Sequence, residues 1–190
     1  MILKDIVLKN RSYRRFFGQE HIDISLLKEW VNNARLTPSA RNAQPLKYML
    51  CNTGTGNEKI FDCLAWASFL KDWDGPVEGE RPSAYIIMLS DTKIAGNFYC
   101  DHGIASQTIL LSAVEAGYGG CIIASVKRGQ LREAFGISEQ FDIIQVLALG
   151  KPKEVVVIEK MIDDDFKYWR DDNQLHHVPK RDLDNIITIL

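Results

Sequence analysis

The sequence predicts an α+β fold in which a mixed, largely antiparallel sheet lies between helical layers in a three-layer α-β-α arrangement, with an extended arm at the C-terminal end. Stretches with helical periodicity alternate with short apolar runs of strand length. Several connections between them are too short for the crossovers that parallel strands need. The chain has 190 residues and is 46% hydrophobic, which is enough to bury one sizeable core.

The helices are predicted from apolar residues at helical spacing. In the second helix Leu27, Trp30, Val31 and Ala34 form one face, and the helix stops before Pro38. The most apolar helix is closed by the glycines of residues 117–120. In chain order the predicted helices cover residues 2–9, 24 to the positions before Pro38, 58–70, 101–115 and 128–135, with a short one within 180–190.

The strands are predicted from short apolar runs bounded by turn residues. A turn is expected at 53–57, and a polar loop containing Gly and Pro at 71–82. From Lys151 the chain is expected to be irregular and polar. The predicted strands cover residues 46–52, 84–90, 121–126 and 142–150.

We expect one domain over residues 1–190, with residues 151–190 as a C-terminal extension. The net charge is −2, but residues 1–50 hold nine Lys and Arg against four Asp and Glu. Nucleic-acid binders usually have a net basic domain, so that class is disfavoured. A basic excess near one end suits an anionic small molecule.

Neither a membrane span nor an exported protein is expected. The most apolar stretch, residues 104–126, contains Gln107, Glu115 and a glycine cluster, which a bilayer span would exclude. The first residues lack the series of a signal peptide. The four cysteines are far apart and form no C-x-x-C pair, so we expect reduced thiols, no metal site and a cytoplasmic location.

Three arginines and a serine lie close together in Arg11-Ser12-Tyr13-Arg14-Arg15. They follow one predicted helix and precede another, where backbone N–H groups are free. Phosphate recognition uses planar guanidinium donors, a small hydroxyl and peptide N–H groups. A solvated basic turn has the same composition, so this segment alone leaves both interpretations open.

A second polar segment, residues 37–45, has two prolines that fix a rigid loop, with Ser39, Asn42 and Gln44 between them. Amide side chains offer a donor and an acceptor together, which suits the N–H and C=O edge of a heterocycle. A helix C-cap followed by a turn is the alternative.

These two segments, in this order, resemble the nitroreductase-like family of FMN-dependent oxidoreductases. The family's Arg-Arg-Ser-x-Arg-x-Phe signature is similar to residues 11–16, and its Pro-Ser-x-x-Asn-x-Gln-Pro-Trp motif to residues 38–45. Residues 101–124 are similar to its central helix and glycine-rich turn, and residues 178–181 to its basic tail. The resemblance covers nearly the whole chain.

The resemblance implies which residues bind FMN. It assigns the phosphate to Arg11, Ser12, Lys180 and Arg181, and the N1/C2=O edge of the ring to Arg14. Ring or ribityl contacts would come from the proline loop of the other subunit. Backbone contacts near the ring would come from residues 121–123. The cofactor-binding set is Arg11, Ser12, Tyr13, Arg14, Ser39, Ala40, Asn42, Gln44, Cys121, Ile122, Ile123, Lys180 and Arg181.

The resemblance also implies an activity and a partner. NADH or NADPH would reduce FMN, and a small-molecule acceptor such as a nitroaromatic or quinone would then take the electrons in a ping-pong mechanism. No catalytic side chain is required. The partner would be a second copy of the chain in an intertwined homodimer, around which residues 151–190 would wrap. Nucleic acid and membrane are not expected partners.

Other functions stay open at this point. One is a specialised reaction in the same family, reductive dehalogenation or flavin breakdown, and another is a non-catalytic flavin-binding storage or sensor protein. Asn10 stands where the family usually has an Arg, and Leu46 where it usually has a Trp. Among the aromatic residues of the 66–80 loop, Trp66 is interpreted as core, whereas Trp73 is the better candidate for a lid over the flavin.

Overall fold

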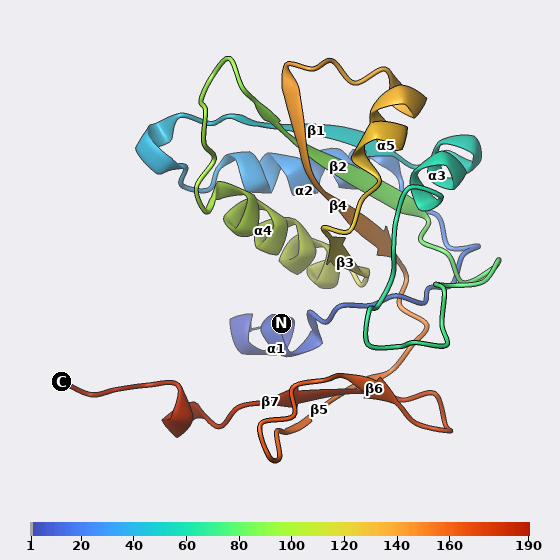
Figure 1. Ribbon diagram of the computed structural model, residues 1–190, viewed down its shortest axis with the longest axis vertical. Coiled ribbons are helices and arrows are strands. Elements are labelled where there is room, and N and C mark those ends of the chain that lie inside the picture. The colour runs from blue at the N-terminus through green and yellow to red at the C-terminus, as the bar shows by residue number, and fades with distance from the viewer. Residues whose placement is uncertain (1) are drawn as a thin grey trace.

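The main sheet of the computed structural model, which describes residues 2–190, has four strands in the order β1-β2-β4-β3, all paired antiparallel (Figure 1). A second sheet, in the order β5-β7-β6, is formed by the end of the chain, and its β5 and β7 pair parallel. The α+β prediction is therefore confirmed. The strands are β1 Leu46–Cys51, β2 Ala84–Asp91, β3 Gly119–Ile123, β4 Phe141–Gly150, β5 Val156–Lys160, β6 Trp169–Arg170 and β7 His176–Lys180.

Helices cover both faces of the main sheet. In Figure 1, α2 and α4 lie on one face and α3 and α5 on the other. No helix within residues 2–190 is both long and apolar enough to cross a bilayer. The helices are α1 Leu3–Lys9, α2 Ile24–Arg35, α3 Gly54–Phe61, α4 Asp101–Glu115 and α5 Arg128–Phe135, with short 3₁₀ turns at Ala40–Asn42 and Leu183–Asn185.

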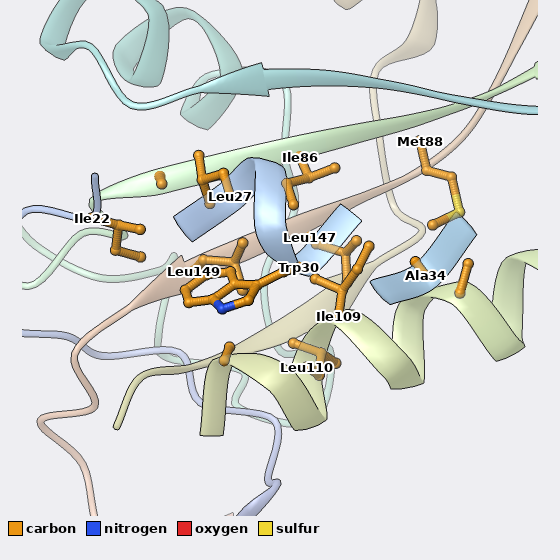
Figure 2. Packing of buried hydrophobic residues seen from close by; sticks show 13 residues of the cluster. Ile22, Leu27, Trp30, Ala34, Ile86, Met88, Ile109, Leu110, Leu147 and Leu149 are labelled. Carbon is orange, nitrogen blue, oxygen red and sulfur yellow. The ribbon is translucent and has the colours of Figure 1, made fainter. Parts of the chain in front are cut away.

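The central strand β2 is buried on both faces and divides the core in two. Ile86 and Met88 face α2 and α4, where Trp30 packs against Ile109 and Leu110 of α4 (Figure 2). Their neighbours on β2 point to the opposite cluster, under α3 and α5. A strand with helices on both sides reads as a continuous apolar run, which is why residues 84–90 are easily predicted.

The third helix differs from its prediction. It covers Gly54–Phe61 rather than residues 58–70, so it occupies the segment expected to be a turn. Pairing with the segment after β3 ends it: Leu64 forms a bridge with Val126, and the N–H of Ala65 donates to the carbonyl of Ser125. Tertiary pairing thus overrides the helical pattern of the sequence between 62 and 70.

The glycines at residues 117–120 have two separate roles. Gly117 ends α4 with a φ of +81°, a conformation that side chains disfavour. Gly120 lies inside β3, and a Cβ there would be 2.3 Å from the carbonyl oxygen of Ala148. The strand begins at Gly119, which pairs with Gly150 of β4, so it starts earlier than predicted, and it ends at Ile123.

The C-terminal arm is more regular than the sequence suggests. Residues predicted to be irregular from Lys151 onward contain β5, β6 and β7, which form the sheet at the bottom of Figure 1. β6 has two residues and β7 is polar and contains Pro179, so neither shows a strand pattern. The β-branched run of β5 was a local strand signal inside the segment expected to be irregular. The role of residues 151–190 in wrapping a partner stays a prediction.

Candidate functional site

The arginine segment is held between the two sheets. Ser12 forms a parallel bridge with Gly120, and the N–H of Tyr13 donates to the Gly120 carbonyl at 3.1 Å. Phe16 is fully buried and forms a bridge with Pro152 just after β4. A Cβ on Gly150 would lie 2.7 Å from the Phe16 ring, so that close approach needs a glycine. The loop is therefore a fixed wall rather than a free basic turn.

A cleft of about 310 Å³ opens beside this loop, here called the cationic cleft. Arg11 and Arg14 line it from the loop, and Lys180 from the end of β7. Among the described residues 2–190, those that line it include no carboxylate, so these charges are available to an anion. The full lining is Asn10, Arg11, Ser12, Arg14, Gln107, Leu110, Ile122, Tyr168, His176, Val178 and Lys180.

Arg14 is oriented by three contacts of its guanidinium. Nη1 donates to the Ser12 carbonyl at 3.2 Å and lies 3.4 Å from Nε2 of His176. The guanidinium carbon lies 4.8 Å from the centre of the Tyr168 ring, a cation–π contact. Arg14 therefore presents a fixed planar cation to the cleft.

The backbone of Arg14 is held by a buried carboxylate, Glu154. The side chain of Glu154 is fully buried and accepts hydrogen bonds from the backbone N–H groups of Arg14 and Arg15. Its second oxygen accepts a bond from Arg170 at 3.1 Å. Glu154 thus links the N-terminal loop to the C-terminal sheet.

His176 adds no positive charge to the cleft near neutral pH. It is 1% exposed, and its Nδ1 is buried without a hydrogen-bond partner. Burial and the nearby charges of Arg14 and Arg170 lower the pKa of His176 to about 4. The ring is therefore neutral above about pH 5.

Glu80 also holds the arginine segment in place, through Arg15. It accepts from Arg15 Nε at 2.5 Å and from Lys153 at 2.8 Å, and its side chain is 13% exposed. The hydrogen bond from Arg15 lowers the pKa of Glu80 to about 2, and the bond from Lys153 makes a smaller contribution in the same direction.

Glu80 should therefore make stability depend on acid. Since the folded-state pKa is below the unfolded one, its contribution is complete above about pH 5 and disappears as the pH falls through about 2. We expect a loss of roughly 2 kcal/mol over this interval, and Glu80→Gln should remove that part of the curve. Urea unfolding at a series of pH values measures both. Parallel curves for the two proteins would contradict the assignment.

The outer edge of β3 forms a second cavity that adjoins the cationic cleft. It is lined by residues 121–125 and by Trp66, and it shares Arg14, Ile122 and Tyr168 with the cleft. β3 is an edge strand, and the side chain of Ile122 is 42% exposed there. Beyond Gly120, which pairs with Ser12, no further strand within residues 2–190 covers this edge, and an edge strand with an apolar side chain suits a flat, partly polar ring.

The proline loop lies elsewhere. Asp101, at the start of α4, accepts from the Ser39 hydroxyl at 2.5 Å and from the Ala40 N–H at 2.9 Å. Asn42 and Gln44 have φ angles near +54°. Residues in this strained, left-handed conformation occur preferentially in functional loops. Ser39 and Gln44 line a cavity that shares no residue with the cationic cleft.

The structure thus brings together one part of the predicted site. Arg11, Ser12, Arg14, Lys180 and residues 121–123 surround the two adjoining cavities. Tyr13 turns away, and its hydroxyl donates to the Lys9 carbonyl. Arg181 is exposed and outside both linings.

Trp66 packs against the core cluster under α3 and α5, in agreement with its interpretation as core, and it also lines the β3-edge cavity. Trp73 packs edge-to-face against Trp66, with the Arg170 guanidinium 4.9 Å from the Trp73 ring, and its role as a lid stays a prediction. Sequence reasoning also missed Glu154, Tyr168 and His176. These three residues lie in the polar tail, where the sequence has no regular pattern of polar and apolar residues. Gln107 of α4 also lines the cationic cleft, and as a polar residue within an apolar helix it was the missed residue with a signal in the sequence.

Comparison with known proteins identifies the family. A sequence model described as "Nitroreductase family" matches residues 7–151, more than half of the chain. The chain belongs to the nitroreductase family.

Two archaeal relatives carry the same name, "Putative NADH dehydrogenase/NAD(P)H nitroreductase". The protein from Archaeoglobus fulgidus is 26% identical over 148 residues, which cover 74% of this nitroreductase family member and 80% of the relative. The protein from Methanothermobacter thermautotrophicus is 26% identical over 171 residues, which cover 87% and 85%.

Solved structures share the fold. A nitroreductase family protein from Clostridium novyi superposes with a TM-score of 0.66 at 21% identity, covering 94% of both chains. A putative nitroreductase from Exiguobacterium sibiricum, solved in complex with FMN, gives 0.70 at 19% identity and covers 90% of this family member and 98% of that chain.

Proposed function

We propose that the protein is an FMN-dependent oxidoreductase that uses NADH or NADPH to reduce small-molecule acceptors such as nitroaromatics or quinones. The observation that carries this proposal is the cationic cleft, which opens directly onto the exposed edge of β3. FMN has the matching shape, with a phosphate at one end and a flat ring at the other.

The residues present suit this cofactor. Arg11 has a buried, unpaired Nε, and Ser12 and Lys180 line the same cleft, so these three would hold the phosphate. Residues 121–123 would contact the ring through their backbone, with Arg14 at its polar edge. When bound, FMN would supply the transfer of electrons between nicotinamide and acceptor.

A second copy of the chain would complete the site. In one chain the proline loop does not reach the cleft, so Ser39, Ala40, Asn42 and Gln44 would contact the cofactor of the partner. Apolar side chains on α1 are exposed, Leu3 by 69% and Leu8 by 51%, which suits burial in a homodimer. Four free cysteines agree with a reducing, cytoplasmic location.

Purification tests the proposal directly. The protein should be yellow and release one FMN per chain on denaturation. Anaerobic mixing with NADH and NADPH in turn, followed by a panel of nitroaromatic and quinone acceptors, should bleach and then restore the flavin spectrum. A colourless protein that takes up no added FMN would disprove the function.

Arg14 should tune the cofactor more than it binds it. A cation near the ring favours the reduced state, in which negative charge builds up, by roughly 1–2 kcal/mol after screening. Arg14→Gln should therefore lower the midpoint potential by roughly 20–45 mV in a dye-equilibrated titration. Arg11→Gln should weaken FMN binding more and shift the potential less. The reverse pattern would mean that the two arginines are wrongly assigned.

A further inference from the structure

His176 is a buried histidine of the C-terminal sheet to which the flavin chemistry described above gives no task. It lies in the middle strand β7, where it pairs with Val156 of β5 on one side and with Arg170 of β6 on the other. Its N–H donates to the carbonyl of Val155 at 2.9 Å. Since the backbone is held on both sides and the residue is 1% exposed, the ring has a fixed place in the structure.

One ring nitrogen of His176 contacts the guanidinium of Arg14. Nε2 of His176 lies 3.4 Å from Nη1 of Arg14, which is 162 positions earlier in the chain. The Tyr168 ring lies against both groups, with its centre 5.2 Å from the centre of the His176 ring and 4.8 Å from the guanidinium carbon. All three residues line the cationic cleft. Arg14 is therefore held by an aromatic ring and by a ring nitrogen that both come from the C-terminal arm.

The contact with Arg14 decides which nitrogen of His176 carries the proton. An arginine donates hydrogen bonds and cannot accept one, so Nε2 must present its lone pair to Arg14. The proton of the neutral ring then lies on Nδ1. Within residues 2–190, Nδ1 has no hydrogen-bond partner that would favour the other tautomer. His176 is therefore a hydrogen-bond acceptor at Nε2, in the Nδ1–H tautomer.

The charges around His176 keep its ring neutral. Arg14 contacts it from the N-terminal loop, Arg170 is its partner on β6, and His177 follows it on β7. The buried carboxylate of Glu154 is already bound to Arg170 and to the backbone N–H of Arg14. Burial, followed by the charges of Arg14 and Arg170, lowers the pKa of His176 to about 4. The acceptor at Nε2 is therefore present at neutral pH and lost in acid.

A neutral acceptor orients Arg14 without cancelling its charge. The side-chain hydrogen bonds of Arg14 go to the Ser12 carbonyl and to His176, and both acceptors are uncharged. The next residue, Arg15, shows the contrast: it forms a salt bridge with Glu80 and does not line the cationic cleft. A carboxylate in the place of His176 would hold Arg14 as firmly, but it would oppose the binding of negative charge beside it. The pairing with histidine therefore suits a cation that acts on a ligand.

We propose that His176 is a positioning residue, which holds the Arg14 guanidinium in place as a neutral acceptor and thereby sets the redox potential of the bound flavin. This role rests on the proposed function, in which Arg14 lies at the polar edge of the FMN ring. Two-electron reduction builds up negative charge at that edge, and a cation held in place stabilises this charge better than a mobile one. His176 acts on the flavin through Arg14.

The first test compares two substitutions at position 176 by dye-equilibrated redox titration of the holoprotein at pH 7. His176→Leu removes the acceptor and keeps a side chain of similar size. The preference of the protein for reduced over oxidised FMN should fall roughly 3–10-fold, which corresponds to a midpoint potential lower by about 14–30 mV. His176→Gln keeps an acceptor oxygen, so its preference should stay within about twofold of the unaltered protein. An unchanged potential in His176→Leu, or an equal fall in both variants, would overturn the proposal.

A double-mutant cycle separates positioning from a general structural role. In a protein that already carries Arg14→Gln, His176→Leu should change the preference for reduced FMN by less than about twofold, because the residue through which His176 acts is gone. His21→Leu removes an exposed histidine outside the cleft and is the matched control, with no expected change in potential. Equal falls from His176→Leu with and without Arg14 would show that His176 acts independently of it, and would refute the proposal.

A measurement on the unaltered chain tests the contact itself and needs no flavin. At pH 7, ¹⁵N NMR spectra should show His176 as the Nδ1–H tautomer, with an unprotonated Nε2. An Nε2–H tautomer could not accept a hydrogen bond from Arg14 and would overturn the proposal. The two functions fail in different ways. A chain that takes up no FMN would refute the proposed function, whereas a bound flavin with an unchanged potential in His176→Leu would refute the role of His176 alone.

Discussion

A variant with Gln in place of both Arg11 and Lys180 should be purified without flavin. The two residues approach the cationic cleft from opposite ends of the chain, and its lining offers no carboxylate to neutralise them. Each charged hydrogen bond to a phosphate contributes roughly 1.5–3 kcal/mol, so losing two should weaken FMN binding at least roughly 100-fold. Fluorescence titration of the apoprotein with FMN measures the change.

The control for this variant loses the same two positive charges at positions outside the cleft. Lys28→Gln combined with Lys93→Gln removes two exposed positive charges away from the cleft and should leave FMN affinity within about twofold, since distant surface charges are screened by salt. If the Arg11 and Lys180 variant bound FMN as tightly as this control, the phosphate would lie elsewhere.

Replacing Glu154 with Ala should destabilise the protein by roughly 3–5 kcal/mol, the range for breaking a buried ion pair. The carboxylate is fully buried, and its removal leaves Arg170, whose side chain is 9% exposed, without its counter-ion. It also leaves the N–H groups of Arg14 and Arg15 unpaired. Urea unfolding followed by circular dichroism measures the free energy of unfolding.

The matched substitution is Glu139→Ala. Glu139 also forms an ion pair with an arginine, Arg132, at 3.4 Å, but its side chain is 87% exposed. A surface pair of this kind contributes at most about 1 kcal/mol. Similar losses in the two variants would show that Glu154 has no special role in joining the loop to the C-terminal sheet.

The main sheet was predictable because its physical signals are local. Residues 84–90 form a continuous apolar run, and α4 and α5 have the predicted bounds, 101–115 and 128–135. The third helix was misplaced since its end depends on pairing between Leu64 and Val126, 62 positions apart, which no local pattern records.

The candidate site divides in the same way. Arg11 and Arg14 stand in a dense cluster that composition reveals. Glu154 and His176 are single polar residues in a tail without a periodic pattern. They reach the site only because the tail folds back and contacts Arg14. Their partners are 140 and 162 positions away in the sequence.

That fold-back has a consequence for how the protein is made. The ribosome must release β7, with Lys180 at its end, before that residue can complete the cleft beside Arg11 and Arg14. Contacts over such separations form late, because the entropy lost in closing the intervening chain is not recovered until they are made. If the cleft holds FMN as proposed, cofactor capture would be the last step of maturation, and a chain cut short before β7 would leave the ribosome with its core built but without the Lys180 side of the cleft.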